Sequence, residues 1–128
     1  MESHSIQNPK KTPYLDWIKQ GKKKYEGRLS SKKEECKLFV SKQIKFHDQN
    51  KPDSYIICEI TELLDFEDFG KAYDVLGDML IPNSNKNEVI RMYNKIFDPN
   101  NYDKLNDGVT SDQIKCVVAI GIKVIEQQ

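Results

Sequence analysis

The spacing of apolar residues changes at Gly21 from that of a helix to that of a strand, and this change favours a mixed α+β fold. Before Gly21, the side chains of Tyr14, Trp17 and Ile18 follow the i, i+3, i+4 spacing of one helix face, and glycine is common where a helix ends. After Gly21 the period is two over residues 24–29, as in a strand. One face of this strand carries Tyr25, Gly27 and Leu29, and the other carries Lys24, Glu26 and Arg28. We expect the first of these faces to point into the core.

The rest of the chain predicts strands and helices in an order typical of an α+β domain. Further strands are expected over 38–46, over 55–60 or a little beyond, and over 113–128. Helices are expected over 65–77 and 85–98, and a loop over 100–112. Strands of mixed length with helices between them suggest a sheet curled into a small barrel. Gly121, inside the last strand, indicates a bend or a close approach by another part of the chain.

A chain of 128 residues is long enough for one compact domain with a core and too short for two. We expect a flexible N-terminal lead-in over 1–12 and a single domain over 13–128. No apolar run is long enough to cross a membrane, and the N-terminal residues lack the apolar stretch of a secretory signal. These features predict an intracellular, cytoplasmic protein that does not bind membranes, with a nuclear location as the alternative.

The three cysteines, Cys36, Cys58 and Cys116, are odd in number and far apart, which favours reduced thiols over disulfides. Cys58 and Cys116 lie inside apolar runs and are expected to fill the core. The two histidines, His4 and His47, show no ligand spacing with the cysteines. The sequence therefore predicts no metal site and no cofactor.

The formal net charge of zero conceals an asymmetry along the chain. Residues 1–51 contain 13 Lys or Arg and 6 Asp or Glu, a net charge of +7, whereas residues 52–128 contain 7 and 14, a net charge of −7. A basic N-terminal part favours an anionic partner, and Lys10 and Lys11 suit attraction to phosphate. The alternative is that the two halves neutralise each other across the folded surface. Lys outnumbers Arg 18 to 2, which is typical of proteins encoded by A+T-rich genomes. This composition is compatible with a cellular or a viral origin.

The basic stretch around Gly21 contains one carboxylate, that of Glu26, among several cations. The candidates for ligand binding are Gly21, Lys22, Lys23, Lys24, Glu26 and Arg28. Arg grips a phosphate or carboxylate through parallel hydrogen bonds, and Lys supplies a movable charge or, when its pKa is lowered, a nucleophile or base. The carboxylate could orient the cations, accept a hydrogen bond from a base or ribose, or act as a general base. The alternative is an exposed strand face whose opposite charges pair weakly.

The spacing Gly21-x-Lys23-x-x-Glu26-x-Arg28 closely resembles the signature of the ASCH superfamily of PUA-like domains. The resemblance covers roughly residues 13–126 and includes a Phe-x-x-Phe pair, the stretch "VIRMYNKIF" and the last strand, "CVVAIGI". It implies a small PUA-like β-barrel with flanking and inserted helices. The three charged residues of the motif would line a cleft beside this barrel, and the glycine would shape the turn. A Gly-Asp turn that is common before the second strand of the family is absent here, where the chain reads "SKKEECKLFV".

The resemblance leaves three functions open. ASCH domains are generally thought to bind RNA or nucleotides, which implies RNA, a nucleotide or a cyclic dinucleotide as the partner. Some members are described as ribonucleases, so a metal-independent phosphodiesterase that uses Lys23 and Glu26 is the enzymatic alternative. A bacterial group that deacetylates N4-acetylcytidine has a Thr at the position of Glu26, and this chain lacks it, which disfavours that activity. The third alternative is a scaffold for protein interactions. Asp78 is a further candidate for the cleft.

Overall fold

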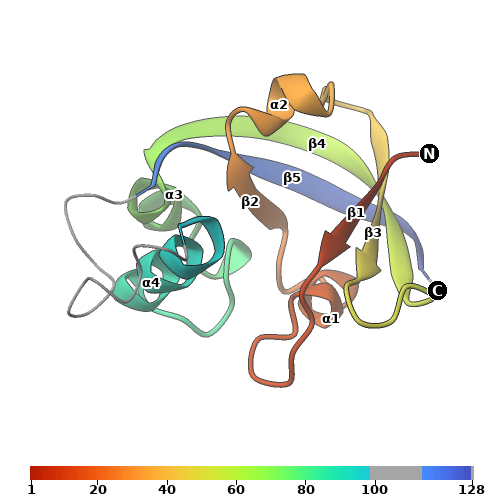
Figure 1. Cartoon of the computed structure of the whole chain (residues 1–128), viewed down its shortest axis with the longest axis horizontal. Coiled ribbons are helices and arrows are strands. Elements are labelled where there is room, and N and C mark those ends of the chain that lie inside the picture. The colour runs from red at the N-terminus through yellow and green to blue at the C-terminus, as the bar shows by residue number, and fades with distance from the viewer. Residues whose placement is uncertain (99–113, 128) are drawn as a thin grey trace.

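A five-stranded sheet forms the frame of the molecule in the computed structural model, which describes residues 1–98 and 114–127 (Figure 1). In chain order the strands are β1 (Ser3–Ile6), β2 (Tyr25–Leu29), β3 (Gln43–Asp48), β4 (Tyr55–Asp68) and β5 (Lys115–Gln127). Their order across the sheet is β1-β3-β4-β5-β2. Only the pair of β1 with β3 is parallel, and the other three pairs are antiparallel.

The sheet is strongly curved, but it does not close into the barrel that the sequence predicts. The long strands β4 and β5 arch over the molecule, while β1 and β2 stand apart at the two ends of the sheet (Figure 1). The register of β4 on β5 shifts twice, between Ile57 and Cys58 and between Ile60 and Glu62, and such irregularities bend a strand. The fold is therefore α+β as expected, with a curled sheet that is open between β1 and β2.

Within residues 1–98 and 114–127, four α-helices and one 3-10 helix accompany the sheet. They are α1 (Tyr14–Lys19), α2 (Lys32–Glu35), α3 (Phe69–Leu76), the 3-10 helix η1 (Gly77–Met79) and α4 (Lys86–Phe97). Side chains cap the longer helices, because Asp68 accepts a hydrogen bond from the Lys71 backbone N–H and Asn85 accepts one from that of Glu88. Buried side chains of β3, β4, β5, α1, α3 and α4 form one apolar core. Among the described residues, no helix has the length and apolar character needed to span a membrane.

The structure differs from the sequence prediction at the N-terminus and around the third predicted strand. Residues Ser3–Ile6, expected within a flexible lead-in, form β1, which the apolar pattern could not reveal because only Ile6 in it is buried. β4 continues to Asp68, so Phe66 lies in a strand and α3 starts at Phe69. The strand predicted over 38–46 is shorter, since β3 begins at Gln43. The loop predicted over 100–112 lies outside the described residues.

Two further expectations about single side chains are corrected. Cys116 is exposed rather than in the core, because β5 has only just begun there and its backbone φ is 59°. Tyr25 packs against the margin of the core instead of pointing into it, and its hydroxyl donates to Glu62 at 2.5 Å. The close approach predicted at Gly121 is confirmed, because a Cβ there would lie 2.8 Å from Oγ1 of Thr61 and 3.0 Å from Cε1 of Tyr25.

We predict that Gly27→Ala destabilises the fold by roughly 1–3 kcal/mol, because β2 passes directly under a stack of aromatic rings. A Cβ at Gly27 would lie 2.6 Å from the Tyr93 hydroxyl oxygen and 2.8 Å from Cε1 of Phe69, whose ring stacks on that of Tyr93 with centroids 3.7 Å apart. Chemical denaturation would measure the loss. Gly70→Ala is the control, since a Cβ there would lie 3.1 Å or more from its nearest neighbours, which are side-chain atoms of Asp68, Lys86 and Ile90. Equal losses in the two variants would contradict this packing argument.

Candidate ligand-binding site

A pocket of about 270 Å³ lies where the curled sheet is open. One wall is the end of β1 and the residue after it (Ser5, Ile6 and Gln7), and the opposite wall is β2 (Glu26, Gly27 and Arg28). Helix α4 contributes Met92, Tyr93, Ile96 and Phe97, and the remaining lining residues are Tyr14, Gln49 and Ile81. The two strands that do not pair thus enclose a cavity slightly smaller than most small-molecule sites.

Glu26 supplies a carboxylate at the wall of this pocket although the residue is only 5% exposed. Its Oε1 forms an ion pair with the Arg28 guanidinium, whose Nη1 is 2.8 Å away, and lies 4.0 Å from Nζ of Lys23. Its Oε2 is buried and has no hydrogen-bond partner among the described residues. A buried polar atom without a partner costs about 1–3 kcal/mol and more if it is charged, so Oε2 is an acceptor available to a ligand.

Lys23 lies behind the pocket and is 1% exposed. Its Nζ donates to the backbone carbonyls of Tyr25, at 2.6 Å, and Leu80. Burial lowers the pKa of Lys23 to about 8, Glu26 opposes this shift, and Arg28 adds to it. The ammonium therefore ties β2 to the segment after η1 and supplies positive charge behind the Glu26 carboxylate without lining the pocket.

Arg28 places hydrogen-bond donors beside the free oxygen of Glu26. Its interactions within the described part of the chain both use Nη1, which donates to Glu26 and to the backbone carbonyl of Gly27 at 2.9 Å. Arg carries five N–H donors, so those on Nε and Nη2 remain for a ligand. The pocket thus offers one carboxylate acceptor next to a fork of donors, the combination that reads a planar polar group such as the edge of a nucleobase.

The aromatic and apolar wall of the pocket comes from α4. The rings of Tyr93 and Phe97 are nearly parallel to that of Phe69, which lies between the sheet and the helix. Burial raises the pKa of the Tyr93 hydroxyl well above its ordinary value, with a further contribution from Glu26. This hydroxyl is buried against the Gly27 backbone, and a backbone hydrogen bond there partly opposes the rise of its pKa.

A second pocket, of about 630 Å³, continues the first along α4. The two share Gln7, Tyr14, Met92 and Ile96 as lining residues. The far part of the second pocket is lined by Pro9 and Thr12, which bracket the exposed Lys10 and Lys11. The site is therefore a groove with a deep polar end at Glu26 and an open end beside a basic loop.

The structure brings together only part of the predicted residue set. Glu26 and Arg28 line the pocket, and Lys23 lies directly behind them. Lys22 and Lys24 are exposed and line neither of these two pockets, but Lys24 lines a separate pocket together with Gly21 and Lys23. Gly21 has a φ of 76°, which glycine adopts without strain and which turns the chain from α1 towards β2. Asp78, in η1, is exposed and lies outside the lining of the pocket.

The residues of α4 that line the site were predicted as one apolar helix face and not as part of a site. Their amphipathic spacing indicates packing against a core, and this is what Val89, Ile90 and Tyr93 do. Ile96 is 38% exposed although it belongs to the same stripe. The apolar face of this helix extends beyond the residues that pack on the core. That excess length is the signal that could have indicated the wall of a pocket.

An open, curled five-stranded sheet with helices α3 and α4 inserted between β4 and β5, and with a charged pocket at its unpaired edge, defines a PUA-like domain. The ASCH domain family matches residues 11–126, nearly the whole chain, and the chain belongs to this family. A comparison with curated proteins gave no match.

Solved structures with the same fold include members of this family. The hypothetical protein PH0355 aligns with a TM-score of 0.65 and 20% identity, over 98% of this chain and 100% of its own. Protein PF0455 from Pyrococcus furiosus aligns with a TM-score of 0.59 and 21% identity, over 97% and 98% of the two chains. An ASCH structure from Zymomonas mobilis aligns with a TM-score of 0.57 and 14% identity, over 98% of this chain and 70% of its own. At these identities the similarity establishes the fold.

We predict that the buried ammonium of Lys23 makes the stability of the fold rise between about pH 8 and pH 10. The pKa of Lys23 falls from 10.5 to about 8 on folding, so the unfolded chain binds more protons than the folded chain in this window. Raising the pH therefore disfavours the unfolded chain, and the free energy of unfolding increases. The gain between pH 7 and pH 9.5 is on the order of 1–2 kcal/mol. Denaturation of the wild type and of Lys23→Met across this range measures it, because the difference between the two cancels the other titrating groups. A pH-independent difference would contradict a buried, charged Lys23.

Proposed function

We propose that this ASCH domain binds single-stranded RNA, with one unpaired base or terminal nucleotide in the pocket between β1 and β2. The observation that carries the proposal is the carboxylate of Glu26, a residue that lines the pocket and whose buried Oε2 has no hydrogen-bond partner among the described residues. Single-stranded RNA presents unstacked bases whose polar edges are free for hydrogen bonds. An N–H donor on such an edge would satisfy Oε2, while the remaining donors of Arg28 would bind a carbonyl of the base or a phosphate oxygen.

The groove supports a nucleotide chain rather than a free base alone. A base that reaches Glu26 would lie between the polar wall of β2 and the apolar side chains of α4, where the half-buried Phe97 offers an aromatic ring. The next nucleotide would follow the second pocket towards Lys10 and Lys11, where exposed cations attract phosphate. In this arrangement Lys22 and Lys24, which the sequence places among the binding residues, contribute at most long-range attraction.

Hydrolysis of a phosphodiester bond is the second candidate, and the lowered pKa of Lys23 is the observation in its favour. The geometry favours it less than binding. The Lys23 ammonium donates to two backbone carbonyls and does not line the pocket, so it would have to leave these partners to reach a substrate. Glu26 is better placed for a base, but its Oε1 already neutralises two cations.

We predict that Glu26→Gln weakens binding of short single-stranded RNA at least tenfold, because a hydrogen bond to a charged acceptor contributes about 1.5–3 kcal/mol. Fluorescence anisotropy at fixed salt measures the affinity, and circular dichroism verifies the fold. Glu126→Gln, on the exposed end of β5, is the control with the same change in net charge. Equal affinities of the two variants would contradict the proposal. Cleavage products from the wild type that vanish in Lys23→Met would favour the hydrolase instead.

We also predict that Ile96→Glu weakens RNA binding at least tenfold, because Ile96 lines both pockets and a carboxylate there would repel phosphate. The substitution should cost little stability, since this side chain is 38% exposed. Ile125→Glu is the matched control, with a side chain that is 45% exposed on β5. If both variants lose the same affinity, the effect is one of net charge and the groove is not the binding surface.

A further inference from the structure

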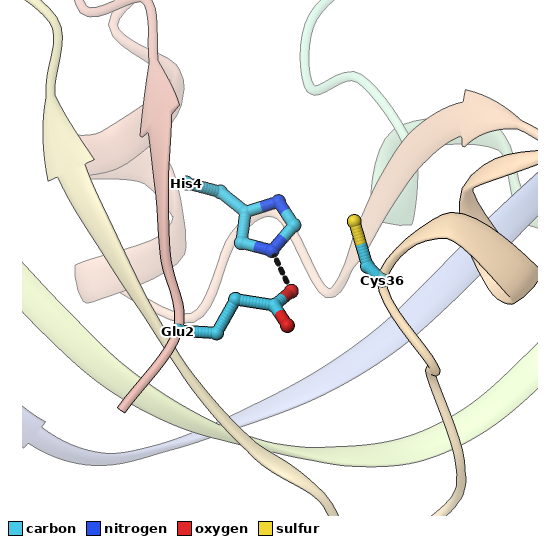
Figure 2. A group of neighbouring side chains, drawn as sticks. All are labelled: Glu2, His4 and Cys36. Atoms are coloured by element: carbon cyan, nitrogen blue, oxygen red, sulfur yellow. Dashed lines mark hydrogen bonds and ion pairs between the residues drawn. The ribbon is translucent and has the colours of Figure 1, made fainter.

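Three side chains with different metal-binding atoms converge at the start of the chain, outside the pocket already described. Glu2 directly precedes β1, His4 lies in β1, and Cys36 is the residue that follows α2 (Figure 2). One oxygen of Glu2, one ring nitrogen of His4 and the sulfur of Cys36 all lie within 4.8 Å of one another. The sequence spacing gave no sign of this group, because Cys36 is brought to β1 only by the fold.

The set of donors suits a borderline metal ion. Carboxylate oxygen, imidazole nitrogen and thiolate sulfur are the ligands of Zn²⁺ in proteins, whereas Mg²⁺ and Ca²⁺ take oxygen almost alone. Zn²⁺ holds its ligand atoms roughly 3.3–3.8 Å apart in a tetrahedron, so small side-chain rotations would bring these three into range. Each of the three residues is partly buried, which leaves the fourth position open to water or another ligand.

Neighbouring groups already orient two of the three side chains. Lys42 holds Oε1 of Glu2 at 3.1 Å and also donates to the backbone carbonyls of Cys36 and Lys37, so it ties β1 to the end of α2. The other carboxylate oxygen, Oε2, contacts Nε2 of His4. The His4 ring in turn packs against Phe46, with centroids 5.9 Å apart. The Lys42 ammonium would repel a metal ion, but its charge is neutralised by the Glu2 carboxylate. Hydrogen bonds of this kind also hold metal-ligating carboxylates in place.

We propose that Glu2, His4 and Cys36 form a Zn²⁺ site that fastens β1 to the end of α2. The ion would displace the proton shared by Nε2 of His4 and Oε2 of Glu2, and this proton and that of the Cys36 thiol would both be released to solvent. β1 needs such a fastening because it is four residues long and, among the strands, pairs only with β3. Since Ser5 and Ile6 of β1 line the pocket, the ion would also order one wall of the binding groove.

Titration of the full chain with Zn²⁺ in competition with a chromophoric chelator tests the proposal, and Co²⁺ serves as a spectroscopic probe. The N-terminus must be native, without a histidine tag. We expect one Zn²⁺ per chain, a thiolate-to-cobalt charge-transfer band, and no competition by Mg²⁺. Cys36→Ser and His4→Ala should each weaken Zn²⁺ binding at least tenfold. Cys116→Ser and His47→Ala are the matched controls and should stay within twofold of the wild type.

The variants separate the outcomes. Absence of equimolar binding by the wild type would overturn the proposal, and so would loss of binding in Cys116→Ser or retention in Cys36→Ser. Cys36 lies outside the sheet, so Cys36→Ser keeps the test valid even if His4→Ala loosens β1. Because the test reads metal binding and not RNA binding, its failure would leave the proposed function of the pocket intact.

Discussion

Burial of the Lys23 ammonium is the interaction that organises the rest of the site. A charged group removed from water requires hydrogen bonds and a counterion, and Lys23 obtains both from backbone carbonyls and from Glu26. The carboxylate is in turn held by Arg28 at 2.8 Å. A single carboxylate among several cations is therefore the counterion for two of them. Because both cations approach Oε1, the other oxygen, Oε2, is left without a hydrogen-bond partner in the part of the chain that the structure describes.

The open edge of the sheet gives this charge cluster its ligand-binding character. A closed barrel would pair β1 with β2 and fill the space that the pocket occupies. Unpaired edge strands normally invite association with other chains, and here α4 covers part of the opening. The groove that results has a polar floor from the strand and an apolar wall from the helix. The same arrangement makes β1 the weakest wall, which is why a metal ion that fastens it would matter for binding.

Local signals explain what the sequence could predict. α1, β2 and α4 have clear apolar periods and suitable end residues, so their positions were predicted closely. The spacing from Gly21 to Arg28 also indicated the family. By contrast, β1 is polar and is held mainly by backbone pairing with β3, which leaves no apolar pattern to read. The start of α3 was missed because Phe66 fits the helical spacing although it lies in β4.

The family resemblance implied that Glu26 and Arg28 line a cleft, but the rest of the pocket lining could not be predicted, because it depends on how distant elements meet. Alternation along the strand puts Glu26 on the same face as Lys24, yet in the structure Glu26 is buried and Lys24 is exposed. Similarly, nothing in the sequence of α4 distinguishes residues that pack on the core from those that line the groove.

The central claim is that RNA enters the opening between β1 and β2 and meets Glu26. Titration of isotopically labelled protein with a short single-stranded RNA, followed by NMR, tests this claim most directly. The account predicts that the largest chemical-shift changes occur at residues 26–28 and 92–97, including the side-chain carboxylate of Glu26. Changes centred on Lys22 and Lys24, with the pocket residues unaffected, would contradict it.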